Sequence, residues 1–181
     1  MVEPSFWTNK RVLLTGHTGF KGSWISLWLN MMGVKLCGLS INGSNNQITY
    51  NSLKLSDDIV DIRGDVRDIN LCQNVINDFR PEIIIHMAAQ ALVRDSYQEP
   101  IYNYETNING TLNILESARN CDFVKVVLII TSDKCYENVE KDYMYKESDK
   151  LGGFDPYSSS KACAELITQA YRRSYFKEKN I

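Results

Sequence analysis

Tyr157 and Lys161 are the two residues of this sequence whose types and spacing are best suited to acid–base chemistry. If their segment is helical, residues four positions apart lie on one face, one turn from each other. An ammonium group near a phenol stabilises the phenolate, which lets the tyrosine take a proton from a substrate hydroxyl. A Tyr-x-x-x-Lys spacing is common by chance, so its meaning depends on a cofactor site elsewhere in the chain.

Three glycines near the N-terminus, Gly16, Gly19 and Gly22, have the spacing of a dinucleotide-binding turn. They lie between a β-rich run at 11–15 and an apolar-periodic segment at 20–32 that we expect to be helical. In such turns the first glycine permits a tight turn, the second lets a pyrophosphate approach, and the third lets the helix pack against the sheet. The helix N-terminus attracts the phosphates. The predicted cofactor-binding residues of this turn are Gly16, His17, Thr18, Gly19, Phe20, Lys21 and Gly22.

The end of the second expected strand favours NAD over NADP. An acidic residue that binds the ribose 2′-hydroxyl is usual at this position, but the sequence has Ser40, with Asn42 close behind. Either side chain can hydrogen-bond a ribose, and no arginine stands there to pair with a 2′-phosphate. Asp65 and Val66 follow the third expected strand, where we expect the adenine ring, although Asp65 is equally a candidate turn or cap residue.

The elements that must position these groups alternate between strands and helices. Further strands are expected at 34–40, 59–62, 82–87 and 124–130, and further helices at 68–79, 102–119 and 156–179. Asp68 is expected to cap the first of these helices, and 41–58 is expected to be mainly loop. Five such repeats predict an α/β fold with a Rossmann-like, doubly wound parallel sheet.

More candidate residues follow two of the expected strands, because ligands of such folds bind outside the carboxyl ends of the strands. Small residues after the fourth strand allow close approach of a cofactor: Ala88, Ala89 and Gln90. A hydroxyl, an acid and a cation follow the fifth strand: Ser132, Asp133 and Lys134.

Composition excludes several other classes of protein. With 181 residues, 44% hydrophobic and 23% charged, the chain is typical of a globular domain rather than a disordered one. Its net charge of −2 argues against a nucleic-acid binder. The five cysteines show no zinc-ligand spacing, so we expect no metal and mostly buried, reduced thiols. The sequence shows neither a signal peptide nor an apolar run that could span a membrane, so we expect a cytoplasmic protein.

Taken together, these motifs make the sequence resemble the extended short-chain dehydrogenase/reductases, and most closely their CDP-glucose 4,6-dehydratase branch. The resembling stretches span nearly the whole chain: GHTGFKGSW (16–24), HMAAQALVRDSY (86–97), TNINGT (106–111), TSDKCYEN (131–138) and LGGFDPYSSSKACAE (151–165). Lys21 and the TSDKCYEN segment are specific to this branch. The related dTDP-glucose branch has an Asp-Glu pair where this chain has Asp133 and Lys134.

The resemblance implies dehydration of a nucleotide-activated hexose with NAD, in deoxysugar biosynthesis for O-antigen lipopolysaccharide. Tyr157, supported by Lys161 and Ser132, would take the O4 proton during oxidation at C4. Lys134 would assist removal of the C5 hydrogen, and Asp133 would protonate the departing 6-hydroxyl before hydride returns to C6. The resemblance also places Arg94 and Asn107 in the substrate site, and it implies a homodimer joined through the helices expected at 102–119 and 156–179.

The resemblance also implies that the chain is incomplete, because members of the family have about as many residues again after the position of Ile181. We therefore expect residues 1–181 to be an NAD-binding domain that lacks its nucleotide-sugar domain, with the strand at 124–130 left at a sheet edge, and to be inactive alone. Two alternatives remain at this stage. One is a nucleotide-sugar epimerase or reductase of the same family, which would not need Asp133 and Lys134, and the other is an inactive cofactor-binding fragment.

Overall fold

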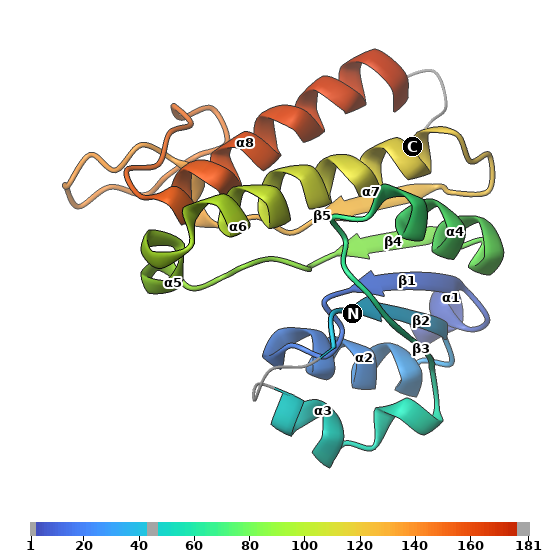
Figure 1. The fold of residues 1–181 in the computed structure, drawn as a ribbon. Coiled ribbons are helices and arrows are strands. Elements are labelled where there is room, and N and C mark those ends of the chain that lie inside the picture. Colours follow the sequence, from blue (N-terminus) through green and yellow to red (C-terminus); the bar gives the residue numbers. More distant parts are fainter. Residues whose placement is uncertain (1–2, 43–46, 177–181) are drawn as a thin grey trace.

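A five-stranded parallel sheet forms the centre of the protein in the computed structural model, which describes residues 3–42 and 47–176 (Figure 1). The strand order is β3-β2-β1-β4-β5. The strands are β1 (Arg11–Thr15), β2 (Lys35–Ser40), β3 (Val60–Arg63), β4 (Ile83–His86) and β5 (Val126–Ile129). The order reverses between β1 and β4, which is where ligands bind in open α/β sheets. The predicted doubly wound fold is confirmed.

Helices cover both faces of this sheet, as Figure 1 shows. The longer helices are α2 (Phe20–Met31), α4 (Ile69–Phe79), α7 (Gly110–Arg119) and α8 (Pro156–Tyr171). The shorter ones are α1 (Pro4–Trp7), α3 (Ile48–Ser52), α5 (Val93–Gln98) and α6 (Pro100–Tyr104). Single turns of 3₁₀- or π-helix are also present in the described part of the chain: η2 (Leu55–Asp57), η3 (Glu105–Asn109), η4 (Asp133–Cys135) and η5 (Arg172–Phe176).

Alternation of side chains along the strands divides the core into two layers. On β1, Leu13 points into the layer under α4 and α7, whereas Val12 and Leu14 point into the layer under α2. All three side chains are fully buried. Strands that are apolar on both faces are typical of parallel sheets covered by helices on each side, and this explains why β1 and β4 read as continuous apolar runs. Four of the five cysteines are buried: Cys37, Cys72, Cys121 and Cys135.

The long helix expected at 102–119 is interrupted by one π-helical turn. It consists of α6, the π-turn η3 and α7, beginning at Pro100. The extra residue of a π-turn rotates the following helix, and such turns occur often at functional sites. The last helix changes in the same way, because α8 passes into a second π-turn, η5. The expected end of this helix, 177–179, lies outside the described residues.

Several short helices were not expected from the sequence. The stretch 41–58, interpreted as loop, contains α3 and η2, although 43–46 lies outside the described residues. The helical spacing of the large apolar residues in α2 predicts that they face the core, but the structure differs. Trp24 and Trp28 are about half exposed, and the buried face is formed by small residues and Leu29. The N-cap predicted at Asp68 is confirmed, since its carboxylate accepts from the N–H groups of Asn70 and Leu71.

Candidate active site

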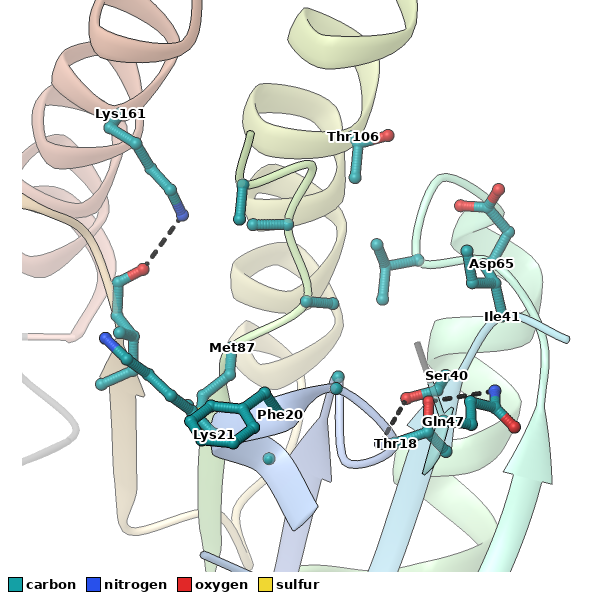
Figure 2. Close-up of a pocket in the computed structure, with 18 of the residues that line it drawn as sticks. Thr18, Phe20, Lys21, Ser40, Ile41, Gln47, Asp65, Met87, Thr106 and Lys161 are labelled. Atoms are coloured by element: carbon teal, nitrogen blue, oxygen red, sulfur yellow. Dashed lines mark hydrogen bonds between the residues drawn. The ribbon is translucent and has the colours of Figure 1, made fainter. Parts of the chain in front are cut away.

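A cavity of about 540 Å³ lies at the carboxyl ends of the strands and extends across the sheet, from the β2 and β3 ends to β5 and α8 (Figure 2). Its walls come from turns that follow all five strands and from three helices. The lining residues are Gly16, Thr18, Gly19, Phe20, Lys21, Gly22, Ser40, Ile41, Gln47, Gly64, Asp65, Val66, Met87, Ala88, Ala89, Ala91, Tyr102, Thr106, Ile130, Thr131, Tyr157 and Lys161.

The glycine turn between β1 and α2 forms the floor of the cavity. Gly16 has φ = +76°, and a Cβ there would lie 2.8 Å from the main-chain nitrogen of Ala88. A Cβ on Gly22 would lie 2.1 Å from the carbonyl oxygen of Gly16, so this glycine is required for the helix to pack. Gly19 is different, because its Cβ would meet only that same oxygen, at 3.3 Å. Gly16 and Gly22 thus shape the turn, whereas Gly19 keeps a face of it clear for a ligand.

The N-terminus of α2 fits a dinucleotide pyrophosphate. Its N-cap, Gly19, provides no side-chain hydrogen bond, and the first turn contains no acidic residue. By contrast, the carboxylates of Asp68 and Asp155 cap α4 and α8. Free N–H groups and the positive end of the helix dipole therefore face the cavity at α2, and both favour an anion.

At the β2 end of the cavity, where an acidic residue is usual, Ser40 belongs to a buried hydrogen-bond network. His17 is fully buried beneath the turn; its Nδ1 lies 3.0 Å from Ser40 Oγ, and its Nε2 lies 3.1 Å from Asp61 Oδ1. Asp61, on β3, also accepts from the Tyr50 hydroxyl (2.9 Å) and from Arg63 (2.8 Å). Burial lowers the pKa of His17, although the Asp61 carboxylate opposes this shift. The network holds Ser40 at the cavity wall, where its Oγ accepts from Thr18 N–H at 3.4 Å.

Asp65 lies at the same end of the cavity, together with Val66. Its carboxylate accepts from Arg67 Nη2 at 2.7 Å, and Arg67 also pairs with Glu105 of η3 at 2.9 Å. Burial opposes ionisation of Asp65, but hydrogen bonds from Arg67 prevail and lower the pKa of this carboxyl group. The pairing fixes an ionised carboxylate at the position where we expected the adenine ring, and it ties the β3 end to the π-turn.

A buried histidine supports the small residues after β4. Thr15 Oγ1 accepts from the N–H groups of Met87 and Ala88, both at 3.1 Å, so its own proton points to His86 Nδ1, 2.7 Å away. The proton of neutral His86 is then on Nε2, which faces Thr111 Oγ1 at 3.3 Å. Burial and the nearby charge of Lys161 lower the pKa of His86 to about 3, which favours this neutral form.

Tyr157 and Lys161 both line the opposite end of the cavity. They lie one turn apart on α8, in agreement with the predicted spacing, and both are at least nine-tenths buried. Tyr157 N–H donates to Ser96 Oγ at 3.2 Å, and Lys161 Nζ donates to the carbonyl oxygen of Ile130 at 3.1 Å. Burial lowers the pKa of Lys161 to about 8, although Glu165 opposes this shift. The ammonium group is therefore held at the end of β5, facing the cavity.

Seven of the residues predicted from the sequence are absent from the cavity wall: His17, Gln90, Arg94, Asn107, Ser132, Asp133 and Lys134. Ser132, Asp133 and Lys134 follow Thr131, which does line the cavity. Ser132 is partly buried as the N-cap of η4, where its Oγ accepts from Lys134 N–H at 3.2 Å, and Asp133 and Lys134 are exposed on that turn. Arg94 is exposed on α5. Asn107 is 1% exposed, and its amide bonds the main chain of Gln90 at 2.9 and 3.0 Å.

Asn107 therefore holds the loop after β4. Its amide also donates to Ser160 Oγ at 2.8 Å, which joins the π-turn to α8. Gln90, predicted to bind the cofactor, serves as the partner of Asn107 and Asn103 and is absent from the cavity wall.

Some residues that line the cavity were not predicted from the sequence to belong to a site. Gln47 comes from the stretch read as loop, and Tyr102 and Thr106 come from the turns at the start of the interrupted helix. Thr106 begins the TNINGT stretch, but neither that stretch nor any motif at Gln47 or Tyr102 indicates that these side chains line a cavity. Ile130 and Thr131 could have been found from their positions at the end of an expected strand and directly after it. Within residues 3–42 and 47–176, no group of three or more His, Cys, Asp or Glu side chains is arranged to hold a metal ion. None of the helices described in these ranges is both long and apolar enough to cross a membrane.

A doubly wound parallel sheet with a glycine-rich first turn and a Tyr-x-x-x-Lys pair at the same cavity defines an extended short-chain dehydrogenase/reductase. A family model described as GDP-mannose 4,6 dehydratase matches residues 13–178. The chain belongs to this family.

Similar proteins agree with this assignment. The chain is 47% identical to a CDP-glucose 4,6-dehydratase of Salmonella typhimurium over 180 residues, which cover 99% of the chain and 50% of that protein. A UDP-glucose 4-epimerase of Thermus thermophilus, solved in complex with NAD, is 31% identical with a TM-score of 0.77, covering 91% of this chain and 51% of the other. A dTDP-glucose 4,6-dehydratase of Streptomyces venezuelae, solved with NAD bound, is 26% identical with a TM-score of 0.79, covering 91% and 52%. The chain spans about half the length of the relatives it matches.

Proposed function

We propose that this chain is the NAD-binding part of an enzyme that oxidises a nucleotide-activated hexose at C4, removes water across C5–C6 and returns hydride to C6, with CDP-glucose as the substrate. The observation that carries the proposal is that the open N-terminus of α2 and the Tyr157–Lys161 pair lie at one cavity. The Salmonella relative, a CDP-glucose 4,6-dehydratase at 47% identity across almost the whole chain, supports the choice of reaction and nucleotide.

NAD is the cofactor that fits this cavity. The free N–H groups of α2 and the clear face of Gly19 accommodate the pyrophosphate, Ser40 and Asp65 lie at the adenosine end, and Tyr157 and Lys161 lie at the nicotinamide end. When bound, NAD supplies the acceptor for the C4 hydride and later the donor to C6, so the net reaction is loss of water and not oxidation.

Tyr157 acts as the base that takes the O4 proton, and Lys161 stabilises the resulting phenolate through its charge. The ketone formed at C4 acidifies the C5 hydrogen. Lys134 assists removal of that hydrogen, and Asp133 protonates the 6-hydroxyl as it leaves. Both side chains are exposed on η4, directly after Thr131 of the cavity wall. The turn η4 packs against α8, the helix that carries Tyr157.

A further part of the proposal concerns the association of two copies of the protein. We infer that the protein forms a homodimer through the surface formed by α6, α7 and α8. Leu166 is 55% exposed on this surface and Tyr104 is 37% exposed, whereas Leu115 of α7 is buried in the core and does not contribute to it.

A product assay tests the proposed reaction. The full protein is incubated with NAD and CDP-glucose, and the product is analysed by mass spectrometry and by the absorbance that 4-keto sugars develop in alkali. A dehydratase gives a product lighter by one water, whereas an epimerase gives one of unchanged mass with an inverted hydroxyl. Parallel reactions with UDP-glucose, dTDP-glucose and GDP-mannose test the choice of nucleotide. Equal turnover of all four would contradict it.

A further inference from the structure

Lys21 occupies a position where its charge is unfavourable in the protein alone. It is the second residue of α2, whose N-terminus has neither an acidic residue in its first turn nor a side-chain cap. A cation in the first turn is repelled by the positive end of the helix dipole. Among the described residues Lys21 forms no ion pair. A locally unfavourable residue of this kind indicates a role in the site.

The side chain of Lys21 extends along the floor of the cavity toward its β5 end (Figure 2). Lys161 lies at the same end, held by the carbonyl oxygen of Ile130. The one carboxylate among the lining residues, Asp65, belongs to the opposite end and is already paired with Arg67. Glu165 lies close by but accepts a hydrogen bond from Thr131 Oγ1, at 2.5 Å. The β5 end of the cavity thus has two cationic side chains and no acidic lining residue.

We propose that Lys21 raises the tendency of bound NAD to accept a hydride. The inference rests on the proposed function, which places the nicotinamide at the β5 end beside Tyr157 and Lys161. The oxidised ring carries a positive charge and the reduced ring is neutral. A nearby ammonium group therefore disfavours the oxidised form relative to the reduced form, by simple Coulomb repulsion.

The effect of Lys21 on the two dissociation constants, for NAD⁺ and for NADH, distinguishes this role from a simple phosphate contact. The pyrophosphate is the same in NAD⁺ and NADH, so a lysine that only binds phosphate strengthens both equally. A lysine that acts on the ring changes the ratio of the two dissociation constants. Removing the Lys21 charge should raise the ratio Kd(NADH)/Kd(NAD⁺) by about three- to tenfold, the scale of one charge partly screened by solvent.

The experiment measures both dissociation constants by calorimetry for the full protein and three variants. Lys21→Met removes the charge at similar length, and Lys21→Arg keeps it. Lys35→Met is the matched control, because Lys35 is an exposed residue at the opposite, N-terminal end of β2. We expect a raised ratio in Lys21→Met alone, and we expect added salt to move the unaltered protein toward that variant.

The affinity of bound NAD⁺ for cyanide, which adds to the ring and neutralises it, provides a second measurement. It should fall in Lys21→Met in parallel with the Kd ratio. An unchanged ratio in Lys21→Met, or the same change in Lys21→Arg, overturns the inference while leaving NAD binding intact. Failure of the unaltered protein to bind NAD⁺ overturns the proposed function itself, so the two failures are distinguishable.

Discussion

The ammonium nitrogen of Lys161 lies 3.1 Å from the main-chain carbonyl oxygen of Ile130, the residue that follows β5. This hydrogen bond joins α8 to the carboxyl edge of the sheet and fixes the direction of a buried cation. Because a lysine on a helix samples many rotamers, the contact decides that its charge faces the cavity and not the helix surface.

The buried position of Lys161 predicts a pH-dependent stability. Its pKa is about 8 in the folded protein and about 10.5 when unfolded, so between these values the unfolded state binds more protons and stability rises with pH. Relative to Lys161→Met, the free energy of unfolding of the unaltered protein should rise by up to about 3 kcal/mol between about pH 8 and pH 10.5. Urea unfolding across this range measures the difference. Two parallel stability curves would contradict the prediction.

His86 predicts a pH dependence of the same sign in acid, because its pKa is also lowered in the folded protein. Its pKa is lowered from 6.5 to about 3, chiefly by burial, so between these values the unfolded state binds more protons and stability decreases as the pH is lowered. Relative to His86→Gln, in which this position cannot titrate, the free energy of unfolding of the unaltered protein should fall by up to about 5 kcal/mol as the pH is lowered from 6.5 to about 3. The comparison cancels the contribution of carboxylates common to both proteins. A constant difference over this range would count against a neutral His86.

Gly19 and Gly22 should respond differently to added side chains. Gly19→Val fills the open face of the turn, so it should weaken NAD binding by about tenfold or more, the scale of 1–3 kcal/mol of overpacking, while thermal stability stays close to normal. Gly22→Ala places a Cβ 2.1 Å from the Gly16 carbonyl oxygen and should lower the free energy of unfolding by about 1–3 kcal/mol. Calorimetry and urea unfolding check the pair. Unchanged NAD affinity in Gly19→Val would remove the turn from the cofactor site.

Tyr157→Phe should separate chemistry from binding. Removing the hydroxyl deletes the proposed base but keeps the buried ring, so kcat should fall by at least about 10²-fold, with the Kd for NAD essentially unchanged. Steady-state kinetics with CDP-glucose and the full protein measure the first quantity, and calorimetry measures the second. Near-normal turnover would show that another group takes the O4 proton.

The proposed dimer predicts an effect of surface charge on α8. Leu166→Glu should give a monomer in sedimentation equilibrium without loss of folding, because Leu166 is 55% exposed in a single chain. Ile48→Glu on α3 is the matched control, since Ile48 is 74% exposed and lies away from α6, α7 and α8. A dimer that persists in Leu166→Glu, or an unaltered protein that is already monomeric, would disprove the assignment of this surface.

The sequence by itself determined the elements that depend on local geometry. The strands, the glycine turn, the Asp68 cap and the Tyr157–Lys161 spacing follow from the hydrogen-bonding periods of single segments, which are set by residues close in the chain. Boundaries differed by one or two residues, as at β5, because strand ends depend on the neighbouring strand.

Only the tertiary structure decided which residues share the cavity. An acidic residue for the ribose is usual at the end of β2, but this chain has Ser40 there, and parallel pairing of β2 with β3 brings Asp61 of β3 to the network of His17 and Ser40. The π-turn η3 likewise directs Asn107 toward Gln90 and Ser160. These contacts join residues 17 to 53 positions apart in the chain. No local pattern records such distances, because the polar partner of a buried group is selected by packing and not by sequence neighbours.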